Sequence, residues 1–304
     1  MLNIEGLKLF TEVASKGSIS KVAESTHYSQ PAISQQIKRL EEAIGYDLFT
    51  RSNKGVELTE AGEIVNKYAK NIVRSYYNLL EDLSAIESSF SIIRINCTPI
   101  ISTYALPCTV YSINNSSNSA MANYKLETYT NRSDEIESNI ANGTFDLGII
   151  ICEPGLKSLT SARITTDTLV PVVSPKYRLP EGEMSVEKLA EADLILPSDK
   201  FRVRRKVMEW FSEAGYDTQK LKVSTSMDEI ESIKSMVDKG YGISFLPYLA
   251  IKKELYTKQL KKIEIEGFEL KYEIFLIYKP SRLEDLGFRD FVKTFKRTAQ
   301  KTFC

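Results

Sequence analysis

The sequence is poor in histidine: among 304 residues it holds one, His27. Ser-His triads, histidine general bases and His-rich metal sites all require this side chain, so residues 28–304 contain none of them. Cysteine is also sparse, with four residues scattered along the chain and no CxxC pair. This spacing excludes a zinc ribbon and a dense disulfide framework, and it predicts reduced thiols that serve as small core residues.

An excess of charge of one sign is missing as well. The 40 Lys and Arg residues balance 40 Asp and Glu residues, so any contact with nucleic acid must come from locally placed cations. No apolar run reaches the length of about eighteen residues that a membrane helix needs. Residues 1–10 also lack the basic start and long apolar stretch of a signal peptide. We therefore expect a cytoplasmic protein with no membrane partner, long enough for about two or three domains.

Three short helices are predicted in the first 45 residues. Apolar residues recur at helical spacing up to Gly17, and Ser18 then begins a very short second helix. Ser29 is placed to cap a third helix that carries Pro31 in its first turn, where a missing N–H costs nothing. Tight turns between short helices indicate a helix-turn-helix at about residues 18–37. The buried side of the third helix is expected to hold Ile33, Ile37, Leu40 and Ile44.

The outward side of the third helix carries residue types that read DNA. Gln pairs with adenine, Ser bonds several base edges, and Lys and Arg meet phosphates. A helix that is merely polar on its outer side remains an alternative. The turn-rich segment at residues 50–58 reads as a wing, whose two cations either contact phosphates or stay solvated. The predicted DNA-binding residues are Ser29, Gln30, Pro31, Ser34, Gln35, Lys38 and Arg39 in the helix, with Arg51 and Lys54 in the wing.

Taken together, these segments resemble the signature of LysR-type transcriptional regulators. Val22 and Thr26 depart from the family pattern, but both are packing positions, so DNA reading is not put in doubt. The resemblance implies a winged helix-turn-helix domain over residues 1–58 that binds double-stranded operator DNA. It rests on FTEVASKGSI at 10–19, SQPAISQQIKRLE at 29–41, Gly45, LFTR at 48–51 and LTEAG at 58–62.

A long helix is predicted over residues 59–89. Thr59 is a good N-cap, and two glutamates in the first turn match the positive end of the helix dipole. The apolar residues that follow form a narrow seam of the coiled-coil type, which needs a partner. The alternative is a surface helix packed on its own domain, whereas the resemblance implies a dimerising linker in a homodimer or homotetramer. The seam consists of Ile72, Tyr76, Leu79, Leu83 and Ile86.

The rest of the chain, residues 90–304, alternates β-rich runs with amphipathic helices, which is an α/β pattern. We expect helices that cover a mainly parallel sheet. The resemblance implies an effector domain of the type 2 periplasmic-binding-protein fold, with ligand between two subdomains joined by crossing strands. Subdomain I is placed at about 91–163 and 268–304, and subdomain II at about 164–267. The expected strands are 92–97, 126–129, 145–151, 169–173, 194–196 and 243–246.

Ligands of open α/β sheets bind beyond the carboxyl ends of strands, where helix N-termini favour anions. Four hydroxyls stand at such ends, although plain helix capping is the alternative for each. Residues 199–205 depart from the Ser-Gly-Thr-Arg motif of many relatives, so the effector's identity cannot be transferred. Arg202 and Arg205 either bind a carboxylate or phosphate or are solvated. The candidate effector-binding residues are Thr98, Pro99, Ser133, Ser198, Phe201, Arg202 and Ser226.

The predicted function is a sequence-specific DNA-binding transcriptional regulator that a small-molecule effector controls. An anion is the candidate effector class, and RNA polymerase is a further candidate partner. No catalytic residue, metal site or cofactor is expected. One alternative is a solute receptor with an incidental N-terminal domain, which leaves the Gln and Ser side of the third helix unexplained. The other is an enzyme, but no paired carboxylates, Gly-rich phosphate loop or nucleophile–base pair is recognisable.

Overall fold

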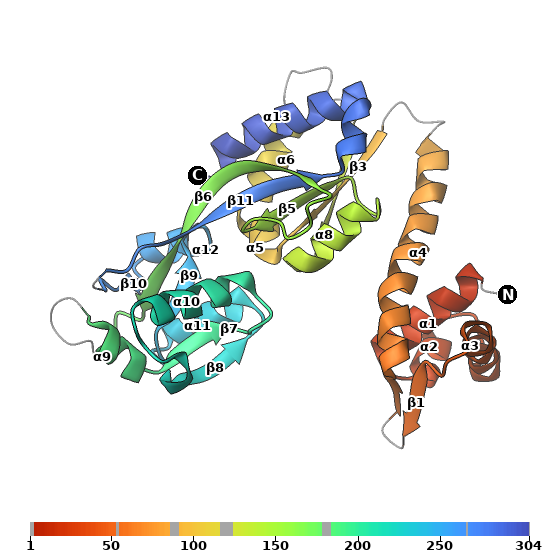
Figure 1. Cartoon of the computed structure of the whole chain (residues 1–304), viewed down its shortest axis with the longest axis horizontal. Helices are drawn as coiled ribbons and strands as arrows, with labels where there is room; N and C mark the ends of the chain where they lie inside the picture. Colours follow the sequence, from red (N-terminus) through yellow and green to blue (C-terminus); the bar gives the residue numbers. More distant parts are fainter. Residues whose placement is uncertain are drawn as a thin grey trace. The chain divides into compact units, whose positions relative to one another are not determined.

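The computed structural model describes residues 3–52, 55–85, 91–115, 124–177, 184–265 and 267–303. The chain divides into two compact units (Figure 1). The first consists of Met1–Ser91 with Asn142–Thr144, and the second holds the remaining residues. No helix in the described part of the chain is both long enough and apolar enough to cross a membrane.

The first unit begins with three short helices and a β-hairpin. As predicted, the Ser18 side chain caps the second helix and Gly17 ends the first, with a φ of 62°. The Asn3 side chain, which was not predicted as a cap, caps the first helix. The buried residues of the three helices form two small clusters, one that includes Phe10 and Leu40 and one that includes Val13 and Val22. The elements are α1 (Ile4–Lys16), α2 (Ile19–Ser25), α3 (Gln30–Ile44), β1 (Phe49–Ser52) and β2 (Gly55–Leu58).

The long helix α4 (Glu60–Ala85) follows the hairpin. Thr59 caps it, because its Oγ1 accepts from the Gly62 N–H at 2.9 Å and donates to the Asp47 carbonyl at 2.7 Å. Gly62 is required by space: a Cβ there would lie 2.0 Å from the Leu48 carbonyl oxygen. The start of α4 is therefore fixed against the segment that leads into the hairpin.

The second unit contains a mixed sheet, in which β10, β6, β11, β5, β3 and β4 are neighbours in that order and β9 also pairs with β6. Helices α5, α6, α8 and α13 surround the β3, β4 and β5 end (Figure 1). We call this end lobe I. Its elements are β3 (Ser91–Cys97), α5 (Pro99–Tyr104), α6 (Leu106–Asn114), β4 (Tyr124–Thr130), α8 (Ser133–Ala141), β5 (Leu147–Ile151), η2 (Pro280–Glu284) and α13 (Leu286–Thr302).

Lobe II lies at the other end of two long strands, β6 (Thr160–Val173) and β11 (Leu270–Tyr278), which run side by side through both lobes (Figure 1). Their antiparallel register shifts between Ile274 and Phe275, opposite Ile164. The remaining elements of lobe II are α9 (Val186–Glu191), β7 (Leu194–Pro197), α10 (Arg202–Glu213), η1 (Thr218–Lys220), β8 (Val223–Met227), α11 (Ile230–Asp238), β9 (Ser244–Pro247), α12 (Tyr248–Tyr256) and β10 (Lys261–Lys262).

The expectation of a mainly parallel sheet is wrong. Strand β11 pairs antiparallel with both β5 and β6, and β6 pairs antiparallel with β9 and β10. Parallel pairing joins β3 to β5 and β7 to β8. The cause is the return of the chain: β11 re-enters lobe I from lobe II and therefore runs against its neighbours. Two predicted strands also differ in extent, because 169–173 is only the second half of β6 and 145–151 begins at Leu147.

Candidate functional site

Helix α3 has one buried side and one exposed side. Its predicted cap is confirmed, since the Ser29 Oγ accepts from the Ala32 N–H at 3.4 Å, and Pro31 lies in the first turn. Ile33, Ile37 and Leu40 are at most 3% exposed. On the other side, Ser34 is half-buried, and the exposed residues are Ser29, Gln30, Pro31, Gln35, Lys38 and Arg39.

The end of α3 is held by a residue that the sequence did not point to. One oxygen of the Glu41 carboxylate accepts from the Leu48 N–H at 2.8 Å and from the Phe49 N–H at 3.3 Å. Gly45 ends the helix with a φ of 84°, a conformation that favours glycine. The helix and the first strand of the hairpin are therefore fixed to each other, so the exposed side of α3 keeps a defined orientation beside the hairpin.

The predicted wing is a two-stranded hairpin. Strands β1 and β2 pair antiparallel, with Arg51 opposite Val56. The Val56 N–H donates to the Gly17 carbonyl at 3.0 Å, which ties the hairpin to the end of α1. Lys54 lies outside the described residues.

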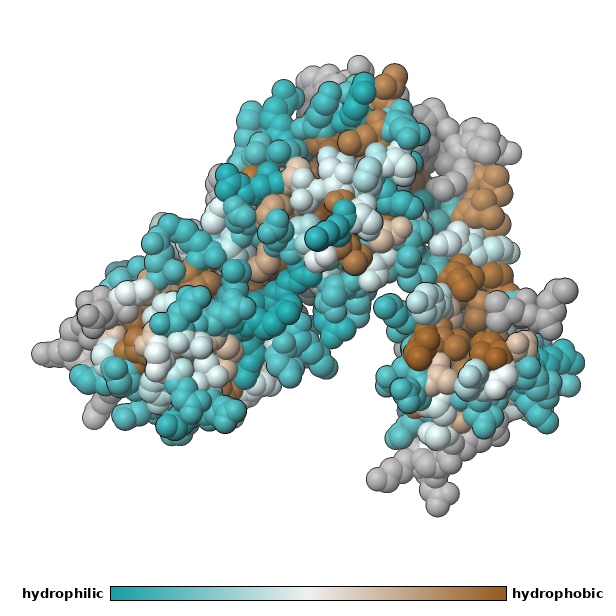
Figure 2. Space-filling model, viewed as in Figure 1, coloured by the Kyte–Doolittle hydropathy of each residue, from teal (hydrophilic) through white to brown (hydrophobic). Residues whose placement is uncertain are grey.

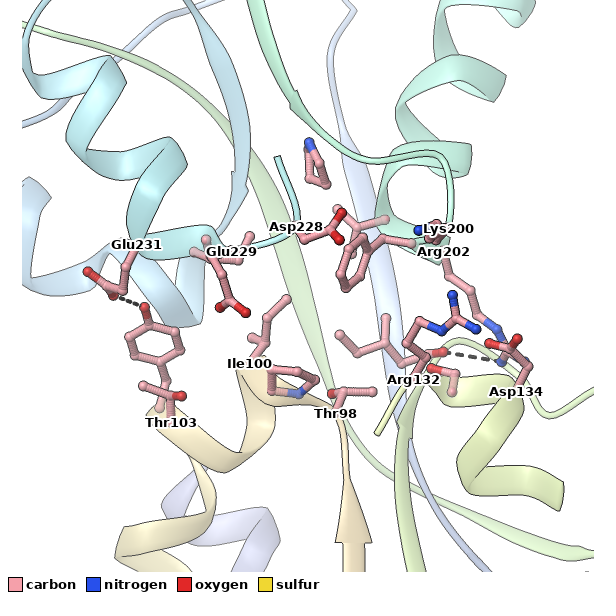
Figure 3. Close-up of a pocket in the computed structure, with 18 residues that line it drawn as sticks. Thr98, Ile100, Thr103, Arg132, Asp134, Lys200, Arg202, Asp228, Glu229 and Glu231 are labelled. Atoms are coloured by element: carbon pink, nitrogen blue, oxygen red, sulfur yellow. Dashed lines mark hydrogen bonds between the residues drawn. The ribbon is translucent and has the colours of Figure 1, made fainter. Parts of the chain in front are cut away.

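A pocket lies between the lobes of the second unit (Figure 3). Lobe I lines it with the end of β3 and the starts of α5 and α8, and lobe II with the segments that begin α10 and α11. Strand ends and helix starts of both lobes thus converge on one space, as expected for a ligand site in an α/β fold. Its lining includes Thr98, Pro99, Ile100, Thr103, Tyr104, Arg132, Ser133 and Asp134 from lobe I, and Lys200, Phe201, Arg202, Asp228, Glu229 and Glu231 from lobe II.

One contact across the pocket joins Arg202 of α10 to the buried Glu137 of α8. The Arg202 Nη1 atom also donates to the Ile151 carbonyl at 3.4 Å and to the Glu153 carbonyl at 3.1 Å. The other oxygen of Glu137 accepts from the backbone N–H groups of residues 155 and 156, at 2.8 and 3.0 Å. The Arg202 side chain is 16% exposed and that of Glu137 is 4% exposed, so this is a largely buried ion pair between the lobes.

A second contact across the pocket lies at the opposite end of the view in Figure 3. The Tyr104 hydroxyl of α5 donates to the Glu231 carboxylate of α11. Glu231 also pairs with Lys234 at 2.9 Å, and Lys234 pairs with Glu254 of α12 at 2.6 Å. Burial, together with the hydrogen bond to Glu231, raises the pKa of Tyr104 to about 12, so its hydroxyl is protonated at neutral pH and can donate.

Two parts of the chain match known protein families. Residues 4–63 match the family described as "Bacterial regulatory helix-turn-helix protein, lysR family". Residues 91–300, more than half of the chain, match the family described as "LysR substrate binding domain". The chain belongs to the LysR family. It is a DNA-binding transcriptional regulator with a substrate-binding effector domain.

Relatives extend along nearly the whole chain. A "Probable RuBisCO transcriptional regulator" of Cyanidioschyzon merolae (strain NIES-3377 / 10D) is 30% identical over 292 residues, which cover 92% of this chain and 93% of that protein. The "RuBisCO operon transcriptional regulator" of Allochromatium vinosum is 29% identical over 296 residues, covering 96% and 95%.

Solved structures of the LysR family share the fold. The crystal structure of CbnR, described as a LysR family transcriptional regulator, matches with a TM-score of 0.72 at 19% identity, covering 98% of this chain and 99% of CbnR. Full-length CbnR complexed with its target DNA matches with a TM-score of 0.69 at 19% identity, covering 98% and 100%.

The structure brings most of the candidate effector residues of this LysR-family chain together. Thr98, Pro99, Ser133, Phe201 and Arg202 all line the pocket. Thr98 is 6% exposed, its hydroxyl forms no cap on α5, and its Oγ1 has no hydrogen-bond partner in the described part of the chain. Plain helix capping therefore does not explain Thr98, which leaves its hydroxyl available to a ligand.

Two other candidates lie elsewhere. Ser198 and Ser226 are not among the residues that line the pocket. The Ser226 hydroxyl accepts from Arg204 at 3.1 Å, and the residue lies in strand β8 instead of capping a helix at Met227. The helix starts later, at Ile230, because strand β8 continues through Met227 to pair with β7.

Sequence reasoning also missed several lining residues, notably Tyr104, Lys200, Asp228 and Glu229. Tyr104 and Lys200 follow strands that the sequence did predict, at 92–97 and 194–196, but neither was selected, whereas Asp228 and Glu229 follow β8. Because β8 was not recognised in the sequence, the acidic turn that follows it could not be placed at the pocket.

Proposed function

We propose that α3 enters the major groove of operator DNA and that an effector bound in the pocket between the lobes alters this binding. The observation that carries the DNA proposal is the division of α3 into a buried apolar side and an exposed side of Gln, Ser, Lys and Arg. Glutamine and serine at such positions read base edges, and the cations contact phosphates. The complex of CbnR with its target DNA supports this use of the fold.

Gln35→Ala tests base reading by α3. It should weaken binding to the operator, located by footprinting upstream of this protein's own gene, and leave binding to random DNA nearly unchanged. Arg51→Ala should weaken binding to both DNAs, because a phosphate contact carries no sequence information. Gln219→Ala, an exposed glutamine in lobe II, is the matched control and should change neither. Equal losses on both DNAs from Gln35→Ala would contradict base reading.

Helix α4 supports the proposal that the protein is a homodimer. Four residues of its apolar seam stay exposed in the single chain: Ile72 at 41%, Tyr76 at 39%, Leu79 at 54% and Leu83 at 52%. Apolar residues gather along the visible side of α4 (Figure 2). A seam with this spacing is buried when a second copy of the helix packs against it. The fifth expected seam residue, Ile86, lies outside the described residues.

The effector proposal rests on the pocket and on the two contacts that cross it. Arg202–Glu137 and Tyr104–Glu231 join lobe I to lobe II, so a ligand that enters between them changes the balance between closed and open lobes. The difference between the ligand's affinities for the closed and the open lobes sets how far the ligand shifts that balance. Contact with RNA polymerase and a cytoplasmic location beside the DNA remain parts of this proposal.

Thr98→Trp tests the pocket as the effector site. The larger side chain should fill the space beside the free hydroxyl and abolish the effector response, while operator binding persists. The effector comes from a screen of metabolites of the pathway encoded beside the operator, with altered footprint length as the readout. An unchanged response in Thr98→Trp would place the effector elsewhere.

A further inference from the structure

We propose that the effector carries a protonated amine, which binds to the carboxylates of Asp228 and Glu229. This inference rests on the pocket proposed above as the effector site. Both residues lie in the turn between β8 and α11, and both line the pocket. In Figure 3 the Glu229 side chain extends from lobe II toward Ile100 of lobe I, and Asp228 lies beside it on the lobe II side of the pocket. Neither forms a salt bridge with another described residue, so both charges are available to a ligand.

The cations that line the pocket are mostly occupied. Arg202 is bound to the buried Glu137 and to two backbone carbonyls. Arg132, which precedes α8, pairs with Glu135 in the first turn of that helix at 3.2 Å. Lys200 is the lining cation that has no ion pair among the described residues. An anionic effector would therefore find one free ammonium group and no free guanidinium.

Helix N-termini attract anions. At two of the helix N-termini that line this pocket, however, carboxylate side chains of the protein already occupy that position. Asp134 and Glu135 lie in the first turn of α8, whereas Glu229 precedes α11 and Glu231 lies in its first turn. Helices α5 and α10 have no acidic residue in their first turns, so the partial charge at the start of each, about +0.5, remains. Those two partial charges and one lysine are outweighed by three lining carboxylates without a salt bridge among the described residues, Asp134, Asp228 and Glu229.

A second observation points to a ligand at the same place. Thr98 lines the pocket, is 6% exposed, and has a buried Oγ1 without a partner in the described part of the chain. A buried hydroxyl without a partner is unfavourable, and a ligand group that bonds to it removes this cost. Phe201 and Ile100 add apolar side chains to the lining of the same pocket. The pocket therefore fits a molecule with an amine at one end, a short apolar body and a second polar group.

The test uses three probes with the same five-carbon skeleton and different charges: 1,5-diaminopentane, 5-aminopentanoate and glutarate. Their binding to the full-length protein is measured by isothermal titration calorimetry at low ionic strength. We expect at least one amine probe to bind about tenfold or more tightly than glutarate, a factor that corresponds to about 1.4 kcal/mol. The comparison of the first two probes shows whether a carboxylate at the far end is tolerated.

The double variant Asp228→Asn/Glu229→Gln keeps the shape of the turn and removes its charge. It should reduce the preference for the amine probe about tenfold, whereas the exposed Glu213→Gln on α10 should leave it unchanged. Any of three results would overturn the amine proposal. Glutarate could bind more tightly than the amine probes, all three probes could bind equally or not at all, or the preference for the amine probe could survive in the double variant.

The Thr98→Trp variant distinguishes a failure of the amine proposal from a failure of the proposed effector pocket. If glutarate is preferred and Thr98→Trp abolishes its binding, the pocket stands and the amine class is wrong. If an amine probe binds equally well to Thr98→Trp, the site lies elsewhere and both proposals are wrong.

Discussion

Replacing Arg202 by methionine should destabilise the effector domain, because it removes the counter-ion of a buried carboxylate. Glu137 is 4% exposed at its side chain and would keep only the two backbone N–H donors of Gly155 and Leu156. Removing one partner of a buried ion pair costs about 3–5 kcal/mol. Because two donors remain and Arg202 itself is 16% exposed, we expect a loss near about 3 kcal/mol, at the lower end of that range.

The opposite substitution, Glu137→Gln, should cost less. The amide can still accept a hydrogen bond, and Arg202 keeps the carbonyls of Ile151 and Glu153. The loss is that of a hydrogen bond to a charged group, about 1.5–3 kcal/mol. In the double variant neither charge is left unpaired, so its cost should fall short of the sum of the single costs by at least about 1 kcal/mol.

Urea unfolding of the full-length protein measures these differences in the free energy of unfolding, with tryptophan fluorescence as the signal. The single tryptophan of the chain, Trp210, lies on α10 two turns after Arg202 and packs edge-on against Phe211 and Phe268. Arg205→Met, an exposed arginine of the same helix, is the control and should stay within about 0.5 kcal/mol of the unsubstituted protein. If Arg202→Met is no less stable than Arg205→Met, the pair contributes nothing and Arg202 behaves as a solvated charge.

Two further predictions concern the strand pair between the lobes and the seam of α4. Burial raises the pKa of Asp167, whose carboxylate accepts from Tyr272 at 2.5 Å, so the folded protein keeps a proton that the unfolded chain releases. Its contribution to the free energy of unfolding should therefore fall as pH rises from about 3.9 through the raised pKa. Asp167→Asn should lack this slope in urea unfolding as the pH rises from about 4, and an identical slope would refute the assignment. Leu79→Glu should shift the protein toward monomer in sedimentation equilibrium, whereas Lys70→Glu, exposed outside the seam, should not; an unchanged oligomer in Leu79→Glu would contradict the proposed dimer.

The N-terminal helices could be predicted from sequence because their signals are local. Caps such as Ser18 and Ser29, the glycines that end α1 and α3, and apolar residues at helical spacing all act within a few residues of chain. Strand pairing is different, because it joins distant segments. Strand β11 has alternating burial at Leu270, Tyr272 and Ile274, but no neighbouring residue in the sequence indicates that it pairs antiparallel with β5 and β6. The mixed sheet therefore became visible only in the structure.

The same distinction explains which site residues could be found. Thr98 and Ser133 follow predicted strands, so the general location of ligand sites in α/β folds was enough to select them. The role of Arg202 depends on Glu137, which stands 65 positions earlier and lies on another helix. Without that partner, the basic run Lys200–Lys206 suggests an anion site, as the sequence predicted.

Once folded, the basic run loses much of its attraction for a ligand. Arg202 is bound to Glu137, and Arg204 donates to the Pro197 carbonyl and the Ser226 hydroxyl, at 3.0 and 3.1 Å. The acidic turn at Asp228 and Glu229 meanwhile lines the pocket with no salt bridge in the part of the chain that the structure describes. The charge a ligand meets is set by the groups left unpaired after folding, so the same lobe that looks basic in sequence offers its free carboxylates to an amine.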